Sequence, residues 1–240
     1  MKQILILGAG RSSSSLIKAL INDAKDNDWQ VVVGDVNLEL AASKVADSEV
    51  ARAIAFDIFN SELSKSIISE ADLVVSMLPA SFLIHVAKIC AELGINMLTA
   101  SYLSDEIAAL SPQFEEKGAL LVMEMGLDPG IDHMSAMKVL DSIKDAGHEL
   151  TSFETFTGGL IAPTEEDNPW KYKFTWNPRN VVLAGQGNVK FIQEGRYKYI
   201  PYHRLFSRTE VIHIPGHGYF EGYAIRDSLI YLDSYRLQVI

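Results

Sequence analysis

A short glycine-rich segment near the start of the chain has the residue types needed to hold a diphosphate. Gly8-Ala9-Gly10-Arg11-Ser12-Ser13 follows the apolar run Gln3–Leu7 and precedes a stretch with helical spacing. In such a strand–turn–helix, the first glycine permits a tight turn, and the second lets a phosphate approach the backbone N–H groups at the helix start. Ser13 stands in place of a third glycine and is small. The segment predicts a dinucleotide site that uses Gly8, Gly10, Arg11, Ser12 and Ser13.

Asp35, at the end of the second expected strand, bears on which dinucleotide binds. A carboxylate there accepts hydrogen bonds from the ribose hydroxyls of an adenosine and repels a 2′-phosphate. The next residues, Val36-Asn37-Leu38, include no arginine that would attract such a phosphate, although Arg11 could reach it. We expect NAD(P) as the cofactor, with Asp35 favouring NAD over NADP. The alternative role for Asp35 is to cap the following helix.

Three further segments are expected at the same edge of the sheet. The ligand of an open α/β sheet lies beyond the carboxyl ends of the strands, and these segments follow the fourth, fifth and sixth strands. They are Leu78-Pro79, Thr99-Ala100-Ser101-Tyr102 and Gly126-Leu127-Asp128-Pro129. Here the nicotinamide and its substrate should meet, and the residues expected to contact the cofactor are Leu78, Pro79, Ser101 and Leu127.

The elements that must position these residues alternate regularly over the first part of the chain. Apolar runs alternate with segments of helical spacing, which is typical of βαβ units with a parallel sheet. We therefore predict an α/β fold with a Rossmann-like doubly wound parallel sheet, covered on both faces because its strands are almost continuously apolar. Strands are expected at Gln3–Leu7, Val31–Val33, Ala51–Phe56, Leu73–Met77, Ile95–Thr99 and Leu120–Met123.

Composition changes near residue 128. Residues 1–128 hold 18 acidic and 9 basic side chains, whereas residues 129–240 hold 13 and 12. We predict a dinucleotide-binding domain over 1–128 and a C-terminally incomplete substrate or dimerisation domain over 129–240. The second is expected to be a partial α+β domain with a mostly antiparallel sheet. After a helix near Ile131, its strands are expected at Leu150–Thr157, Val181–Ala184, Val211–Ile214 and Tyr219–Ile225, with a last strand running into Val239-Ile240.

Three segments outside the glycine turn carry a more specific pattern. They are Gly126-Leu127-Asp128-Pro129-Gly130-Ile131-Asp132-His133; Gly158-Gly159-Leu160-Ile161-Ala162-Pro163 with Asp167-Asn168-Pro169 and Tyr172-Lys173-Phe174-Thr175-Trp176; and Tyr223-Ala224-Ile225-Arg226-Asp227-Ser228. Together with the glycine turn they resemble saccharopine reductase, the glutamate-forming saccharopine dehydrogenase family. The resemblance runs through the chain as far as Arg226.

The resemblance implies an NAD(P)-dependent oxidoreductase of lysine metabolism whose small-molecule substrate is saccharopine. One direction reduces the imine of glutamate with α-aminoadipate semialdehyde, and the other oxidises the secondary amine of saccharopine and hydrolyses the imine. By position, it places Ser101 and Asp128 at the substrate or nicotinamide and Arg226 on a substrate carboxylate. Saccharopine carries several carboxylates, which arginine binds in bidentate pairs. Lys173 is a further candidate cation for the same substrate.

The reaction also requires residues that transfer protons. Hydride transfer needs mainly positioning, but imine formation and hydrolysis move protons. Asp128, His133 and Tyr102 are candidate catalytic residues, and the sequence neither chooses among them nor excludes a proton from solvent. Two residues depart from the family pattern. Asp35 stands where a family member that uses NADP is expected to have more basic residues, and Thr157 stands where a cysteine often precedes the paired glycines.

Length and composition restrict the other classes of protein. The chain has 240 residues and a formal net charge of −10, which argues against nucleic acid as a partner, although a local basic patch is compatible with that total. The single cysteine, Cys90, excludes an internal disulfide and a cysteine zinc site; it is expected in the core, and no metal is expected. No apolar run reaches the ~18 residues of a membrane helix, so no membrane association and a cytoplasmic setting are expected.

Two alternative functions remain at this stage. A related imine reductase such as carboxynorspermidine dehydrogenase would bind a more cationic substrate, against which Arg226 and Lys173 argue. A non-catalytic dinucleotide-binding module is the other, because the chain is expected to end within its substrate domain. An exposed strand edge at that end would allow two copies to pair as a homodimer.

Overall fold

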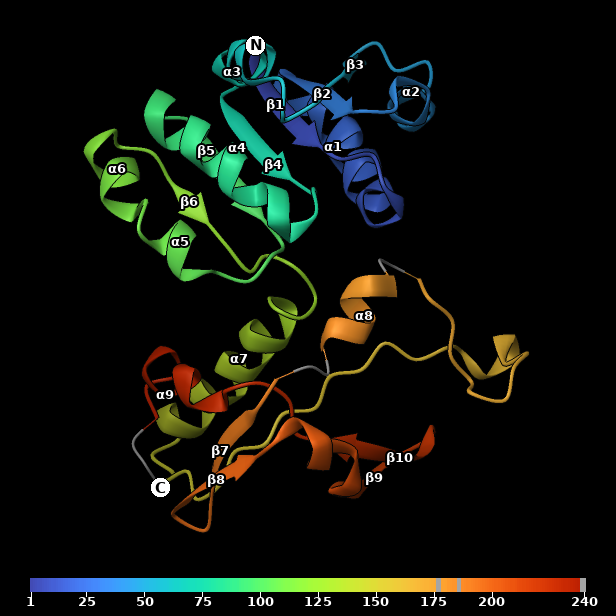
Figure 1. Ribbon diagram of the computed structural model, residues 1–240, viewed down its shortest axis with the longest axis vertical. Coiled ribbons are helices and arrows are strands. Elements are labelled where there is room, and N and C mark those ends of the chain that lie inside the picture. Colours follow the sequence, from blue (N-terminus) through green and yellow to red (C-terminus); the bar gives the residue numbers. More distant parts are fainter. Residues whose placement is uncertain (176–177, 185–186, 238–240) are drawn as a thin grey trace. The chain divides into compact units, whose positions relative to one another are not determined.

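The computed structural model describes residues 1–175, 178–184 and 187–237. The chain divides into two units, Met1–His133 and Met134–Ile240, which we call unit 1 and unit 2. Figure 1 labels the helices and strands of both. Within the described residues, no helix is both long enough and apolar enough to cross a membrane.

Unit 1 contains one sheet of six parallel strands in the order β3-β2-β1-β4-β5-β6. The chain builds outward from β1 to β3, returns to β4 beside β1, and builds outward in the other direction. The order therefore reverses between β1 and β4, and the predicted doubly wound parallel sheet is confirmed. The strands are β1 (Lys2–Leu7), β2 (Trp29–Asp35), β3 (Ala51–Ala55), β4 (Leu73–Ser76), β5 (Asn96–Thr99) and β6 (Leu121–Val122).

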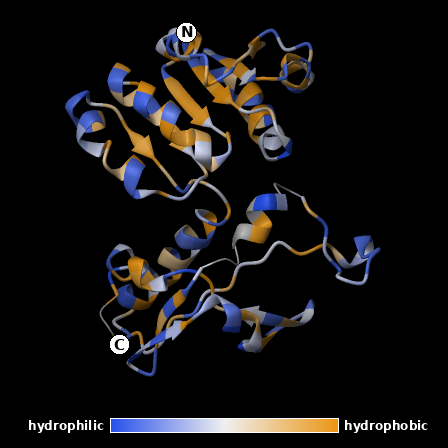
Figure 2. Cartoon of the chain, in the orientation of Figure 1, coloured by the Kyte–Doolittle hydropathy of each residue, from blue (hydrophilic) through white to orange (hydrophobic). Residues whose placement is uncertain are grey.

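Helices cover both faces of this sheet, because successive residues of each strand point to opposite sides. In β1, Ile4 and Ile6 belong to one buried cluster with α1 and α2, whereas Leu5 and Leu7 belong to another with α3 to α6. The strands are accordingly hydrophobic along most of their length (Figure 2). After the short turn η1 (Arg11–Ser13), the helices are α1 (Ser14–Asn27), α2 (Leu38–Val45), α3 (Ser61–Ser69), α4 (Ala80–Leu93), α5 (Asp105–Ala108) and α6 (Ser111–Glu116).

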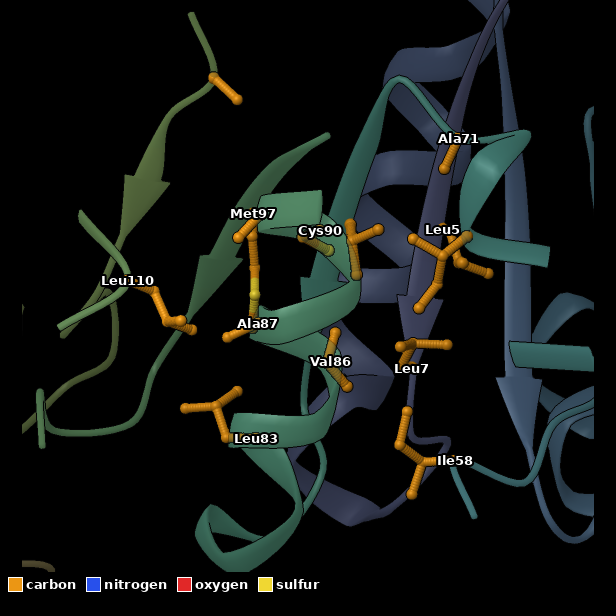
Figure 3. Packing of buried hydrophobic residues seen from close by; sticks show 14 of the residues in the cluster. Leu5, Leu7, Ile58, Ala71, Leu83, Val86, Ala87, Cys90, Met97 and Leu110 are labelled. Atoms are coloured by element: carbon orange, nitrogen blue, oxygen red, sulfur yellow. The ribbon is translucent and has the colours of Figure 1, made fainter. Parts of the chain in front are cut away.

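The helix α4 shows how this packing is achieved. Its buried side chains recur at helical spacing and lie beside Leu5 and Leu7 of β1 (Figure 3). They include Leu83, Val86, Ala87 and Cys90. The prediction that Cys90 lies in the core is confirmed. Burial raises the pKa of its thiol to about 12, so the thiol stays protonated at neutral pH.

Unit 2 is built from helices and two antiparallel hairpins, β7–β8 and β9–β10, as far as its residues are described. The predicted strand Val211–Ile214 is confirmed within β9, and the predicted strand Tyr219–Ile225 is confirmed as far as Tyr223, where β10 ends. Helix α7 starts within the range of unit 1 and continues into unit 2. The elements are α7 (Ile131–Asp145), η2 (Pro163–Glu165), α8 (Pro178–Ala184), β7 (Val189–Gln193), β8 (Arg196–Ile200), η3 (Tyr202–Ser207), β9 (Thr209–Ile214), β10 (Gly218–Tyr223), η4 (Ser228–Ile230) and α9 (Tyr231–Ser234).

Two strand predictions in the middle of the chain are wrong. Residues 150–157 pair with no described strand, and Phe153 instead packs edge-on against the ring of Tyr235 at 5.4 Å between centroids. Val181–Ala184 lies in α8, which begins at Pro178. Proline is pre-organised for the first turn of a helix, and this outweighs the strand preference of two adjacent valines.

The end of the chain also differs from its prediction. Tyr231–Ser234 forms the helix α9 rather than part of a strand, and Tyr235 is buried against α7 in a cluster with Leu140. The predicted last residues of that strand, Val239 and Ile240, fall outside the described residues. The strand edge on which a homodimer was expected is therefore not formed by residues 231–234.

Candidate active site

Gly8 is required by the geometry of the first turn. Its φ of +102° is rarely adopted by other residues, and a Cβ atom there would lie 3.0 Å from the carbonyl oxygen of Met77, just after β4. Its N–H donates to the carbonyl of Gly34 in β2 at 2.8 Å. The turn is thereby held close to the carboxyl ends of β2 and β4.

Gly10 lies on the open side of the same turn. No protein atom lies within 4 Å of the position its Cβ would take, so the backbone is accessible there. Ser13 is buried, and its N–H and hydroxyl both donate to the carbonyl of Gly10, at 3.2 and 2.8 Å. Arg11 and Ser12 are exposed. The serine that replaces the third glycine thus closes the turn, and the side chains of Arg11 and Ser12 remain accessible to a ligand.

Asp35 ties the glycine turn to the end of β2. One carboxylate oxygen accepts from the N–H of Ala9 at 2.7 Å, and the other accepts from the N–H of Asn37 at 2.9 Å. The residue that caps α2 is Asn37, whose side chain accepts from the N–H of Leu40 at 3.0 Å. The alternative role considered for Asp35 as the helix cap is therefore wrong. A carboxylate offers about four lone-pair sites, so Asp35 can still accept from a ligand.

Polar groups from β4 and β5 continue this edge. The hydroxyl of Thr99, which is buried, donates to the carbonyl of Ser76 at 2.9 Å and accepts from the N–H of Ser101 at 3.3 Å. Between them in the chain, Leu78 is half-buried and Pro79 is exposed immediately before α4. Leu78-Pro79 and Ser101, which were predicted to contact the cofactor, therefore lie just after the ends of β4 and β5, and these two strand ends are hydrogen-bonded to each other.

Tyr102 and Asp128 come together from the loops after β5 and β6. The Tyr102 hydroxyl donates to a carboxylate oxygen of Asp128 at 2.6 Å. Asp128 lies in a tight turn that includes a cis bond to Pro129, and in this turn the N–H of Gly126 donates to the Pro129 carbonyl at 2.8 Å. Leu127 is exposed on this turn. Two of the three candidate catalytic residues are thus in direct contact.

The third candidate, His133, lies in the first turn of α7. Its Nε2 atom is 3.9 Å from a carboxylate oxygen of Asp132, whose other oxygen accepts from the N–H of Gly130 at 2.8 Å. Both side chains are mostly buried. Asp132 therefore links the histidine to the turn that carries Asp128.

Glu124 is a residue of this edge that the sequence did not single out. Its φ of +61° is uncommon for a residue with a side chain. Its carboxylate accepts from the N–H of Leu103 at 3.1 Å, and its own N–H donates to the carbonyl of Ser101 at 3.1 Å. Glu124 thus braces the loop that carries Tyr102. Its position two residues after the end of β6 is the signal that could have drawn attention to it.

The candidate substrate cations lie in unit 2. Lys173 is paired with Asp167 at 2.9 Å, and hydrogen bonding to Lys173 lowers the pKa of Asp167. Arg226 has a φ of +58°, and its carbonyl accepts from the N–H of Lys190 at 3.0 Å. The ammonium of Lys190 pairs with Asp227 at 2.9 Å. The chain at Arg226 and Asp227 is therefore fixed to Lys190 of β7. Among the described residues, no group of three or more His, Cys, Asp or Glu side chains could hold a metal ion.

The strand order and the glycine turn define unit 1 as a doubly wound α/β domain of the Rossmann class. Two family models extend the assignment through the rest of the chain. The saccharopine dehydrogenase NADP binding domain matches residues 4–122, and the saccharopine dehydrogenase C-terminal domain matches residues 126–240. The chain belongs to the saccharopine dehydrogenase family.

Similar proteins agree with this assignment. The chain is 32% identical to the NADP⁺, L-glutamate-forming saccharopine dehydrogenase of Saccharomyces cerevisiae, over 98% of this chain and 52% of that protein. It is 34% identical to the alpha-aminoadipic semialdehyde synthase of Arabidopsis thaliana, over 98% of this chain and 24% of that protein. A solved structure of the apo yeast enzyme has a TM-score of 0.88 and 31% identity, over 99% of this chain and 52% of that chain. The chain spans about half the length of the yeast relative.

Proposed function

We propose that the protein to which this chain belongs is an NAD(P)-dependent saccharopine dehydrogenase of the glutamate-forming type, acting in lysine metabolism. The observation that carries this proposal is the match through both units to the yeast enzyme, whose name states that it forms L-glutamate. Oxidation of saccharopine moves a hydride to the nicotinamide and leaves an imine. Water then hydrolyses the imine to glutamate and α-aminoadipate semialdehyde.

The edge of unit 1 fits a nicotinamide dinucleotide, which when bound supplies the hydride acceptor or donor. Its diphosphate needs backbone N–H groups that it can approach closely, and Gly10 leaves that approach open. Exposed Arg11 adds a positive charge, and Ser12 adds a hydroxyl. The residues proposed to hold the cofactor are Gly8, Gly10, Arg11, Ser12, Ser13, Asp35, Leu78, Pro79, Ser101 and Leu127.

NAD rather than NADP is the cofactor that Asp35 supports. Its carboxylate is fixed beside the glycine turn by the N–H of Ala9, where a ribose 2′-phosphate would meet a negative charge. We expect NADH to bind more tightly than NADPH in titration calorimetry. In Asp35→Asn the amide oxygen can still accept from the N–H of Ala9, but the negative charge is lost. The ratio between the affinities for NADH and NADPH should therefore become smaller. Equal or reversed affinities in the unmodified chain would remove this part of the proposal.

Four residues are proposed to bind the substrate: Ser101, Asp128, Lys173 and Arg226. Asp128, oriented by Tyr102, would anchor the cationic amine next to Ser101, and the same pair is the candidate for moving a proton, with His133 as the alternative. Arg226 and Lys173 would bind carboxylates. Lys173 pairs with Asp167 and would exchange that partner for the substrate. Arg226 is the stronger candidate because a guanidinium can pair with a carboxylate through two N–H groups at once.

The proposed role of Arg226 is tested by Arg226→Ala in the full-length protein. Loss of a bidentate carboxylate contact should raise the KM for saccharopine about tenfold or more, with little change in the KM for the dinucleotide. Arg196→Ala, on β8, is the matched control. An unchanged KM for saccharopine would remove Arg226 from the pocket.

The reaction itself is tested with full-length protein, saccharopine and each dinucleotide in turn, followed by the absorbance of the reduced nicotinamide. Turnover of saccharopine with release of glutamate supports the proposal. Turnover only of carboxynorspermidine would transfer the protein to that class of imine reductase. Dinucleotide binding without turnover of either compound would leave a non-catalytic binding module.

A cytoplasmic setting is part of the same proposal, in keeping with a single buried, unpaired cysteine. Cell fractionation tests it directly. Self-association into a homodimer is tested separately by light scattering of the full-length protein.

A further inference from the structure

A hollow of about 860 Å³ lies on the surface of unit 2, where β8 leads into η3. Besides residues 199–201, it is lined by four residues with polar side chains: His203, Arg204, Ser207 and Arg208. These residues all belong to unit 2, whereas the proposed dinucleotide turn belongs to unit 1. A volume of this size is in the range of small-molecule sites.

The hollow is basic within an acidic chain. Residues 199–208 include two arginines, one histidine and no acidic residue, although the whole chain carries a net charge of −10. In the described part of the chain, no carboxylate lies within 4 Å of Arg204 or Arg208, whereas Lys171, Lys173 and Lys190 each pair with one. No carboxylate of the described residues therefore neutralises the two guanidinium charges.

Neutral groups hold Arg208 in place. Its guanidinium donates to the side-chain oxygen of Gln193 at 2.8 Å and lies 5.5 Å from the centre of the Phe191 ring. An amide and an aromatic face orient a guanidinium without cancelling its charge. The side chain is thus ordered in advance for a negatively charged ligand.

The turn that carries both arginines is anchored to the β7–β8 hairpin. Leu205 lies between them in sequence and is buried in a cluster with Val189 and Ile200. The N–H of Arg204 donates to the carbonyl of Pro201 at 2.9 Å, and that of Arg208 donates to Leu205 at 3.3 Å. Because the backbone is fixed, binding an anion would order little beyond the side chains.

We propose that this hollow binds the phosphate group of a small phosphorylated molecule. Two guanidinium groups and the hydroxyl of Ser207 supply several N–H and O–H donors, which the oxygens of a tetrahedral dianion can accept together. Pro201, which also lines the hollow, provides an apolar surface for the organic part of such a molecule.

The experiment is calorimetric titration of the chain with inorganic pyrophosphate. All titrations use a Gly10→Asp background, since the added carboxylate repels phosphate from the glycine turn and the site has open space for the side chain. Arg204→Gln and Arg208→Gln should each weaken binding about tenfold, because each removes a charged donor. Gln193→Ala keeps both charges but releases Arg208, and should weaken binding by a smaller factor. Arg196→Gln, outside the hollow, is the control and should bind as tightly as the parent.

Three results would overturn the proposal. The first is no measurable binding of pyrophosphate by the parent chain. The second is equal weakening in the Arg196→Gln control, which would show only a general charge effect. The third is citrate binding at least as tightly as pyrophosphate, which would identify a carboxylate site. None of these results depends on whether the glycine turn binds a dinucleotide, so the two proposals fail separately.

Discussion

Tyr102 and Asp128 join two loops through one hydrogen bond of 2.6 Å to a carboxylate. Such charge-assisted bonds are short and strong, so this one fixes the direction of the Asp128 oxygens. Tyr102→Phe removes the bond and keeps the ring. We expect kcat/KM for saccharopine to fall by about ten- to a hundredfold, the range for one positioned charged hydrogen bond. Steady-state kinetics of the full-length protein measures this.

The control for this change is Tyr197→Phe, because Tyr197 is 70% exposed on β8. It should leave both kinetic constants and stability unchanged. If Tyr102→Phe behaves like this control, the bond between Tyr102 and Asp128 has no part in the reaction.

Glu124 supports the same loop through hydrogen bonds to Leu103 and Ser101, and its contribution is to stability. Its carboxylate accepts the N–H of Leu103 at 3.1 Å. Glu124→Ala leaves that N–H without its partner and should lower the free energy of unfolding by about 1–2 kcal/mol. Glu124→Gln retains an acceptor oxygen and should recover most of the loss. Urea unfolding measures both, and Glu149→Ala, at an exposed position, is the control. Equal stability of the Ala and Gln variants would contradict this account.

Single residues differ in how far the sequence predicts them. The glycine turn was predictable from one short motif, because the tight turn requires a glycine at position 8 and the approach of a phosphate requires one at position 10. The bond of Asp35 to Ala9 was not, since it depends on how the ends of β1 and β2 lie side by side. Glu124 was hidden for a similar reason: its left-handed backbone arises from contacts with residues more than twenty positions away.

At the scale of elements, unit 1 was predicted well because local pattern and tertiary environment agree. Most of its strands are apolar on both faces, and Gly8 and Pro79 follow the ends of β1 and β4. In unit 2 the local pattern is ambiguous. Val189–Gln193 forms β7 with only one buried residue, Val189, so its sequence lacks a strong strand signal. Val181 and Val182 favour a strand locally but follow Pro178 into a helix.

The turn from β1 to α1 is an element in which two glycines can be separated by experiment. Gly8→Ala places a methyl group against the Met77 carbonyl at a φ of +102°, and should cost about 1–3 kcal/mol of stability. Gly10→Ala meets no protein atom, so stability should change by less than about 0.5 kcal/mol. Its methyl group instead takes the space of the diphosphate, and NADH binding should weaken about tenfold or more. Thermal melts and titration calorimetry measure the pair. If both variants were equally destabilised, the open side of the turn would not be where we place it.

At the scale of the whole chain, each unit has hydrophobic clusters of its own. The buried residues of two large clusters all come from unit 1, and those of two small clusters all come from unit 2. The negative charge also divides: residues 1–128 carry a net charge of −9, and residues 129–240 carry −1. Two cores of different size within one chain favour unfolding in more than one step.

We expect the 240-residue chain to unfold in two calorimetric transitions, one for each unit. Leu5→Ala, in unit 1, should lower the midpoint temperature of only one transition, and Leu140→Ala, in unit 2, that of only the other. Each change should lower the free energy of unfolding of its unit by about 2–5 kcal/mol, because both side chains are fully buried. NADH should stabilise only the unit whose transition Leu5→Ala lowers. At a hundred times its Kd, it should add about 2.7 kcal/mol to that unit's free energy of unfolding. Pyrophosphate, added to the Gly10→Asp variant, should raise the midpoint temperature of only the transition that Leu140→Ala lowers. A single transition that all four changes shift together would show that the units unfold as one cooperative body.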